Sequence, residues 1–153
     1  MDAPERTLSV TRAAMRFCIL RGWAPVEQVP LPDGRRADIL ALLPGGDFAI
    51  LEVKSCARDY LTDAKWEDYR AWCDRLFFAV DLDFPQALLP ADAGLLVAED
   101  REAALLRDAP EHRLAPARRR ALLHRVALLA AGRLAAIIDP AGAAEMRAAL
   151  RLE

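Results

Sequence analysis

Three side chains capable of metal-assisted chemistry lie on two stretches that are predicted to be neighbouring strands. Asp38 is near the start of residues 35–43, and Glu52 and Lys54 are at the end of residues 48–54. Glu52 and Lys54 are two residues apart, so they point to the same face of a strand. A short turn at residues 44–47 predicts a hairpin, which brings Asp38 beside the end of the second strand. The spacing therefore predicts two carboxylates and an amine at one edge of a sheet.

These residue types suit phosphodiester hydrolysis. Mg²⁺ is bound by one or two carboxylates and keeps several waters, and Mn²⁺ can substitute for it. A bound metal activates water and stabilises charge on a phosphate. The neighbouring Lys54 can orient the water, act as its base if its pKa is lowered, or neutralise the phosphate. A purely structural alternative pairs Glu52 with Lys54 and Asp38 with Arg36.

The scarcity of lysine in the chain also indicates a specific role for Lys54. The chain contains 19 Arg but only two Lys, Lys54 and Lys65. Arg cannot replace Lys where a compact point charge or an amine able to lose its proton is required. The two lysines are therefore expected to have specific roles, with retention of two surface lysines by chance as the alternative.

The elements that position these residues follow from hydrophobic periodicity and turn residues. The predicted elements are, in order, a helix at 5–21, strands at 23–31, 35–43 and 48–54, a helix at 56–74, strands at 75–80 and 94–98, an edge strand at 102–107, and helices at about 117–134 and 143–152. In the first helix the expected buried stripe is Leu8, Thr11, Ala14 or Met15, and Cys18. In the second helix, Trp66, Tyr69 and Trp72 are expected to be core residues.

This order, αβββαβ followed by a strand and helices, predicts an α/β fold in the α+β sense: a mixed sheet flanked by helices. The length of 153 residues fits a single domain over 1–153. A basic helical segment is expected from about residue 112.

Charge is unevenly distributed along the chain. Residues 112–153 carry 8 basic and 3 acidic side chains, whereas residues 1–111 carry 13 basic and 20 acidic ones. A basic segment on an acidic body indicates a local anionic partner, although the whole-chain net charge of −2 argues against non-specific coating of DNA. Arg118, Arg119 and Arg120 are candidates to grip a DNA backbone, with a solvated helix start as the alternative.

Other classes find no support in the sequence. Cys18, Cys56 and Cys73 lack C-x-x-C spacing, which disfavours a disulfide framework or a structural zinc site. The hydrolase motifs G-x-S-x-G and H-E-x-x-H are absent. The N-terminus lacks a signal pattern and no uninterrupted apolar run reaches about 18 residues, so we expect a cytoplasmic protein without a membrane partner.

Longer motifs carry a family resemblance. The segments GRRADILAL, LEVKS, DYLTDAKWEDY, CDRLFFAV and FPQALLPADAGLLVA, followed by LAPARRRALL, resemble the MmcB family of bacterial DNA repair proteins over about residues 8–135. Asp38 with Glu52-Val53-Lys54 resembles the motif of the PD-(D/E)XK nuclease superfamily, whose restriction-endonuclease-like core is αβββαβ. Ala37 stands at the Pro position of that motif.

The resemblance implies an endonuclease that acts on DNA in repair. A chain of this size has little room for target recognition, so we expect other repair proteins or a second copy of the chain as partners, in the cytoplasm and at the nucleoid. By motif position, Asp38 and Glu52 would hold the metal and Lys54 would be the catalytic lysine. Many superfamily members add a Glu from the first helix, where this chain offers only Glu5. Glu27 on the first strand is the other candidate ligand. The alternative is that Glu27 simply faces solvent on its strand. A non-catalytic DNA- or protein-binding subunit on the same fold is the alternative function.

Further residues are candidates for substrate binding. Ser55 could donate a hydrogen bond to a phosphate or cap the following helix. Lys65 could contact a phosphate, or form a surface pair with an Asp on its own helix. Arg36 is a further candidate for substrate binding. The alternative is a structural ion pair between Arg36 and Asp38.

Overall fold

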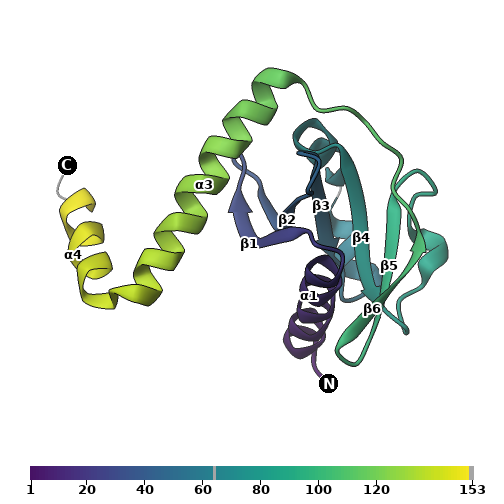
Figure 1. Ribbon diagram of the computed structural model, residues 1–153. Helices are drawn as coiled ribbons and strands as arrows, with labels where there is room; N and C mark the ends of the chain where they lie inside the picture. The colour runs from purple at the N-terminus through teal and green to yellow at the C-terminus, as the bar shows by residue number, and fades with distance from the viewer. Residues whose placement is uncertain (64, 152–153) are drawn as a thin grey trace. The chain divides into compact units, whose positions relative to one another are not determined.

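The computed structural model describes residues 1–63 and 65–151, and the chain divides into two compact units between Ala115 and Pro116. The boundary lies close to residue 112, where the basic segment was predicted to begin. The elements, labelled in Figure 1, are α1 (Ala3–Leu20), β1 (Ala24–Pro30), β2 (Arg36–Leu42), β3 (Phe48–Val53), α2 (Ala57–Thr62), the 3₁₀ helix η1 (Trp66–Trp72), β4 (Arg75–Asp81), the 3₁₀ helix η2 (Gln86–Leu88), β5 (Gly94–Glu99), β6 (Glu102–Arg107), α3 (Pro116–Ile138) and α4 (Pro140–Arg151).

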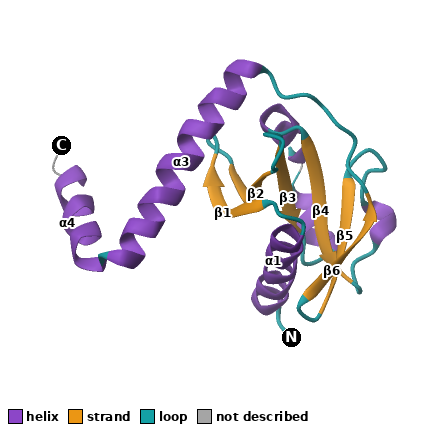
Figure 2. Ribbon diagram, viewed as in Figure 1, coloured by secondary structure: helices purple, strands orange, loops and turns teal. Residues whose placement is uncertain are grey.

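The first unit is built on a six-stranded sheet in the order β1-β2-β3-β4-β5-β6 (Figure 2). The first three strands form the predicted antiparallel meander, β3, β4 and β5 run parallel, and β6 is an antiparallel edge. Gly34 and Gly46 in the two hairpin turns have φ values of 89° and 97°, in the left-handed region that favours glycine. The predicted mixed sheet flanked by helices is confirmed.

Helix α1 packs on one face of this sheet. It begins with a capping box between Asp2 and Glu5, each side chain accepting from the backbone N–H of the other. Its buried face carries the residues Val10, Thr11, Ala13, Ala14, Phe17 and Cys18, which face sheet residues such as Ile39 and Leu51. Leu8 is 50% exposed, so its predicted place in the buried stripe is wrong. The buried face is instead formed by Val10 and Phe17, with Ala13 and Ala14 between them.

The other face is covered by aromatic packing from the segment that follows β3. Tyr60 and Trp66 both pack edge-on against Phe78 of β4, with ring centroids 5.7 and 5.4 Å apart. The continuous helix predicted over 56–74 is wrong, because α2 ends at Thr62 and a 3₁₀ helix begins at Trp66. Packing two aromatic rings six residues apart on one sheet residue does not fit helical spacing, and here tertiary packing overrides local propensity.

A buried carboxylate joins the sheet to the segment that leads out of the first unit. Asp74 is fully buried and accepts hydrogen bonds from the backbone N–H of Phe48 at 2.7 Å and of Leu114 at 2.8 Å. The backbone N–H of His112 also donates to the Asp74 carbonyl at 2.7 Å. Charged side chains are rarely buried without such partners, so Asp74 fixes residues 112–114 at the start of β3.

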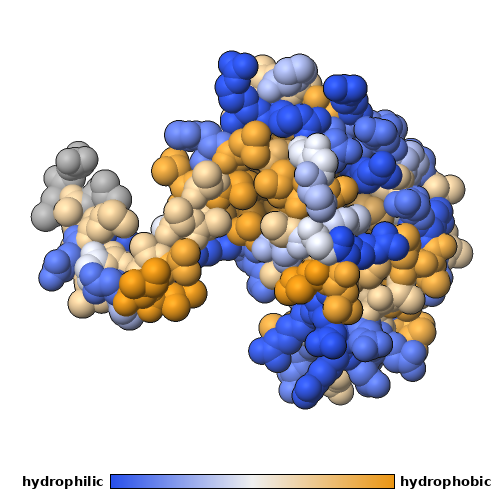
Figure 3. Space-filling view, viewed as in Figure 1, coloured by the Kyte–Doolittle hydropathy of each residue, from blue (hydrophilic) through white to orange (hydrophobic). Residues whose placement is uncertain are grey.

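The second unit consists of α3 and α4. The predicted helices at 117–134 and 143–152 are present but begin earlier, at Pro116 and Pro140; Leu152 lies outside the described residues. Judged by length and composition alone, α3 is long and apolar enough to cross a membrane, if up to two charged residues are allowed within the stretch. Uninterrupted apolar runs, on which the sequence expectation rested, do not capture this property. Apolar side chains gather near the end of α3, where Leu134, Ile137 and Ile138 are exposed (Figure 3).

Candidate active site

The two predicted carboxylates lie side by side on β2 and β3. Ile39 pairs with Leu51 in the antiparallel register, so the preceding Asp38 comes opposite the following Glu52. The Asp38 backbone N–H donates to Glu52 Oε1 at 3.1 Å, and the Val53 backbone N–H donates to Asp38 Oδ2 at 2.8 Å. The strand backbone thus orients both carboxyl groups, as the hairpin spacing predicts.

The electrostatics of this pair are unfavourable to two negative charges. Glu52 is only 2% exposed. Burial, followed by the charge of Asp38, raises the pKa of Glu52 from 4.5 to about 9. The two carboxyl groups also hydrogen-bond each other, which contributes in the same direction. A buried acidic pair of this kind is stabilised by a proton or by a cation placed between the two groups.

Lys54 follows β3 directly and is almost fully buried. Its backbone N–H continues the pairing with β4 by donating to the Ala79 carbonyl at 3.0 Å. Its ammonium donates to Asp63 Oδ2 at 2.8 Å, with side-chain exposures of 7% for Lys54 and 20% for Asp63. Burial opposes the charge, but the hydrogen bond and charge of Asp63 outweigh it, so the pKa of the Lys54 ammonium is raised. The ion pair of Lys54 is therefore with Asp63, rather than with Glu52 as the structural alternative supposed.

These residues open into one cavity of about 480 Å³ on the first unit. The side chains or backbone that line it come from α1, β2, β3 and the α2–η1 segment: Thr7, Asp38, Glu52, Val53, Lys54, Ser55, Asp59, Thr62, Asp63 and Tyr69. The first helix contributes Thr7, and its acid Glu5 is engaged in the capping box of α1. Four of the lining residues carry a hydroxyl group: Thr7, Ser55, Thr62 and Tyr69.

Ser55, a predicted candidate for a phosphate contact, lines the cavity and is buried, with 8% exposure. It does not cap the next helix, because the N-cap of α2 is Cys56, which makes no side-chain cap hydrogen bond. The Ser55 backbone N–H instead donates to Asp59 Oδ2 at 3.2 Å. The Ser55 hydroxyl therefore remains a candidate for a ligand in the cavity.

Several predicted site residues lie elsewhere. Glu27 pairs with Ile39 across β1 and β2, which places it on the sheet face opposite Asp38, exposed. Arg36 and Lys65 are also exposed, and neither lines the cavity. The structure thus brings none of these three to the acidic pair. Arg118, Arg119 and Arg120 begin α3 in the second unit.

The sequence analysis missed two residues that complete the site. Asp63 was treated only as a helix residue, and its contact with Lys54 depends on the break between α2 and η1. Tyr69 was expected in the core and is only 7% exposed, yet its ring end reaches the cavity and its hydroxyl donates to the Arg36 carbonyl at 3.3 Å. Burial and then the charge of Glu52 raise the pKa of Tyr69 to about 12, so its hydroxyl remains a donor. The aromatic spacing gave no signal of this second role.

The donor set fits a divalent cation with few protein ligands. Among the described residues, no cluster of three His, Cys, Asp or Glu side chains suits a metal ion. Asp38 and Glu52 supply two adjacent carboxyl groups that a cation could bind in place of a proton, and each uses one oxygen to accept from a strand N–H. Mg²⁺ is suited to such a pair, because it keeps several waters and takes a substrate phosphate as ligand.

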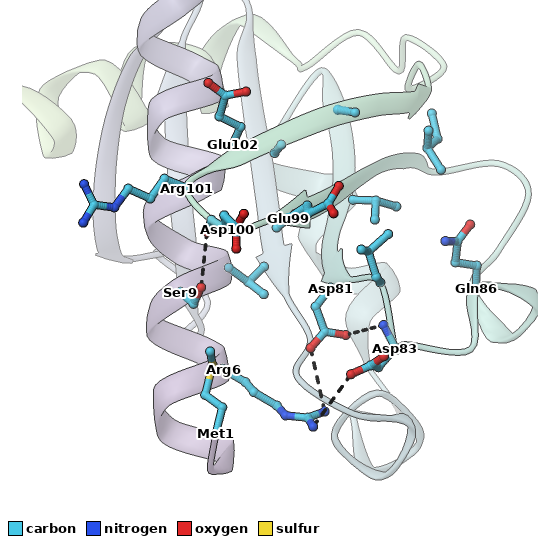
Figure 4. A pocket seen from close by; sticks show the side chains of 17 residues that line it. Met1, Arg6, Ser9, Asp81, Asp83, Gln86, Glu99, Asp100, Arg101 and Glu102 are labelled. Carbon is cyan, nitrogen blue, oxygen red and sulfur yellow. Dashed lines mark hydrogen bonds and ion pairs between the residues drawn. The ribbon is translucent and has the colours of Figure 1, made fainter.

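A larger cavity, of about 1200 Å³, lies along α1 and the ends of β4 and β5 (Figure 4). Arg6 reaches from α1 to Asp81 and Asp83, with N–O distances of 3.8 Å to each. The Ser9 hydroxyl donates to the Asp100 backbone carbonyl at 3.4 Å. None of the predicted site residues is among the described residues that line it, and two of its lining acids, Asp81 and Asp83, are paired with Arg6. We therefore place the candidate chemistry in the smaller cavity.

The six-stranded mixed sheet, its flanking helices and the C-terminal helices are consistent with an α/β nuclease-like fold. The chain belongs to the MmcB-like family of DNA repair proteins, whose family model matches residues 1–141. This confirms the family resemblance and indicates a role in DNA repair.

A solved structure is similar to this chain over most of its length. The SPO1766 protein of unknown function from Silicibacter pomeroyi is 43% identical to this chain, with a TM-score of 0.86 over 90% of this chain and 94% of that one. No curated protein matches the chain.

Proposed function

We propose that this chain is a metal-dependent DNA endonuclease of the PD-(D/E)XK type, which hydrolyses phosphodiester bonds during DNA repair in the cytoplasm and at the nucleoid. The observation that carries the proposal is the convergence of Asp38, buried Glu52 and Lys54 on one open cavity. A module that only binds DNA has no need for a buried Glu52 beside a second carboxyl group, because such a pair is costly to fold.

Asp38 and Glu52 would hold Mg²⁺, or Mn²⁺ in its place. When bound, the cation supplies an activated water and stabilises charge on the phosphate. Because its pKa is raised, Lys54 carries its proton, so it stabilises negative charge on the attacked phosphate rather than acting as the base. The hydroxyl group of Ser55 can donate a hydrogen bond to a phosphate oxygen, whereas the Tyr69 hydroxyl already donates to the Arg36 carbonyl.

Replacing Asp38 by Asn is expected to abolish Mn²⁺ binding and DNA cleavage together. Asn keeps an oxygen that can accept from the Val53 N–H, so the hairpin is preserved, but one of the two charges needed for the cation is lost. Mn²⁺ is titrated calorimetrically into both proteins, and cleavage is measured on single-stranded, nicked and branched DNAs.

Asp33→Asn, in the exposed β1–β2 turn, is the matched control and is expected to behave as wild type. Equal Mn²⁺ binding by wild type and Asp38→Asn would exclude this metal site. A wild-type protein that binds Mn²⁺ but cuts none of the DNAs would favour the non-catalytic alternative.

The basic second unit favours a contribution to DNA binding, whichever function holds. Changing Arg118, Arg119 and Arg120 together to Gln is expected to weaken binding alike on all sequences. The slope of log affinity against log salt on duplex DNA should flatten by up to about 0.9 for each phosphate that the arginines no longer neutralise. Fluorescence anisotropy at several salt concentrations measures this slope. An unchanged slope would show that these arginines are only a solvated helix start.

A further inference from the structure

The contact between Lys54 and Asp63 joins two segments that are separate in the sequence. Lys54 lies at the end of β3, and Asp63 is the C-cap of α2, with φ −86° and ψ 72°. Those dihedral angles end the helix at Thr62. The side chain of Asp63 is thereby released from the helical path and lines the cavity, where it accepts from the Lys54 ammonium at 2.8 Å.

The neighbouring acids are already used by backbone groups. Asp59 Oδ2 accepts from the Ser55 N–H at 3.2 Å, and Glu52 Oε1 accepts from the Asp38 N–H at 3.1 Å. Asp63 is the acid that contacts the head of the lysine side chain. A lysine ammonium has three N–H donors on a flexible four-carbon stem, so a single anchor fixes the head while leaving two donors for the cavity.

We propose that Asp63 is a positioning residue that holds the Lys54 ammonium beside the acidic pair, so that the phosphate meets a fixed positive charge. The inference rests on the proposed nuclease function. In it, the break between α2 and η1 serves catalysis, because it places Asp63 against Lys54. Preorganised charge is effective because it needs no rearrangement when the reaction occurs.

Asp63→Asn is expected to lower kcat about a hundredfold while leaving KM and Mn²⁺ affinity close to wild type, because a displacement of about 1 Å in a catalytic group costs that much. Asp63→Glu restores the carboxylate and is expected to recover part of kcat. The matched control is Asp68→Asn, which removes the carboxylate of an exposed ion pair with Arg35 at 2.9 Å, outside the cavity. Its kcat is expected to equal wild type.

Chemical labelling tests the contact without any activity measurement. The chain has two lysines, so acylation by an amine reagent followed by mass spectrometry reports on Lys54 against exposed Lys65 as an internal reference. The ratio of Lys54 to Lys65 labelling is expected to be low in wild type and Asp68→Asn, and to rise several-fold in Asp63→Asn. Asp63→Glu should lie between them. Melting temperatures recorded in parallel confirm that each variant is folded.

The outcomes separate the two proposals. An unchanged labelling ratio in folded Asp63→Asn would overturn the positioning role, whatever the activity. A higher kcat in Asp63→Asn would also overturn it, because Asp63 would then restrain Lys54 from the substrate. A wild type without any cleavage would overturn the nuclease function and with it the catalytic purpose of the contact, even where labelling shows the Asp63–Lys54 pair to be present.

Discussion

Lys54→Arg is expected to lower DNA cleavage by about a hundredfold or more while the fold and Mn²⁺ binding are retained. The side chain of Lys54 is 7% exposed and its ammonium is 2.8 Å from Asp63, so there is little room for a larger head group. Arg keeps the charge but spreads it over a planar fork, which displaces the charge from its position beside Glu52. A shift of about 1 Å is enough to cause a loss of this size.

The measurement compares cleavage rate, Mn²⁺ affinity and melting temperature in Lys54→Arg and in Lys65→Arg, which changes the chain's other lysine at an exposed position. Lys65→Arg is expected to retain full activity. Retained cleavage in Lys54→Arg would remove Lys54 from the mechanism. Should Lys54→Arg melt at a lower temperature, Lys54→Met, which keeps a long unbranched stem, tests whether the loss of rate follows the charge.

Glu52→Gln is expected to abolish cleavage but to stabilise the metal-free protein. Gln is a neutral isostere of the protonated Glu52 carboxyl group, and its amide can donate to Asp38 without first taking up a proton. With the pKa of Glu52 raised from 4.5 to about 9, the buried carboxyl destabilises the fold at pH 7. The gain in unfolding free energy at that pH is about 2–3 kcal/mol, or roughly 5–10 °C in melting temperature.

The sign of the pH dependence follows from where the protons are bound. Above its ordinary pKa of 4.5, Glu52 loses its proton in the unfolded chain but keeps it in the folded one until about pH 9. Wild-type stability due to this group is therefore complete below pH 4.5 and is lost progressively up to pH 9. The difference in melting temperature between Glu52→Gln and wild type should grow from pH 5 to pH 8.5.

Thermal melts in the presence of a chelator, at several pH values, test this expectation. Glu67→Gln, on the exposed side of η1, is the matched control and should show no pH-dependent difference from wild type. A Glu52→Gln protein less stable than wild type at pH 8.5 would mean that Glu52 is stabilised in its charged form.

The framework of the site was predictable because it depends on local periodicity. The alternation of strand residues places Glu52 and Lys54 on one face, and the short turn at 44–47 fixes the register that puts Asp38 opposite Glu52. The Pro-Asp-Gly and Pro-Gly-Gly turns determine the meander in the same way. The mixed sheet followed from the order of the segments.

Partners that come from separate elements were not predictable. The break between α2 and η1 arises because Tyr60 and Trp66 pack on the same ring of Phe78, which no helical pattern of the segment itself reveals. That break sets Asp63 against Lys54. Likewise, Glu27 lies on the opposite face from Asp38 because its pairing partner is Ile39, a fact of register rather than of residue type.

The sequence by itself determined the chemical groups, their strands and the family to which the chain belongs. Only the tertiary structure decided that the Glu52 carboxyl is buried beside Asp38, that Lys54 is held by Asp63, and that Thr7 and Tyr69 border the cavity. The physical reason is that backbone periodicity acts over a few residues. The charge state and partners of a side chain, in contrast, depend on burial and on groups that folding brings within hydrogen-bonding distance.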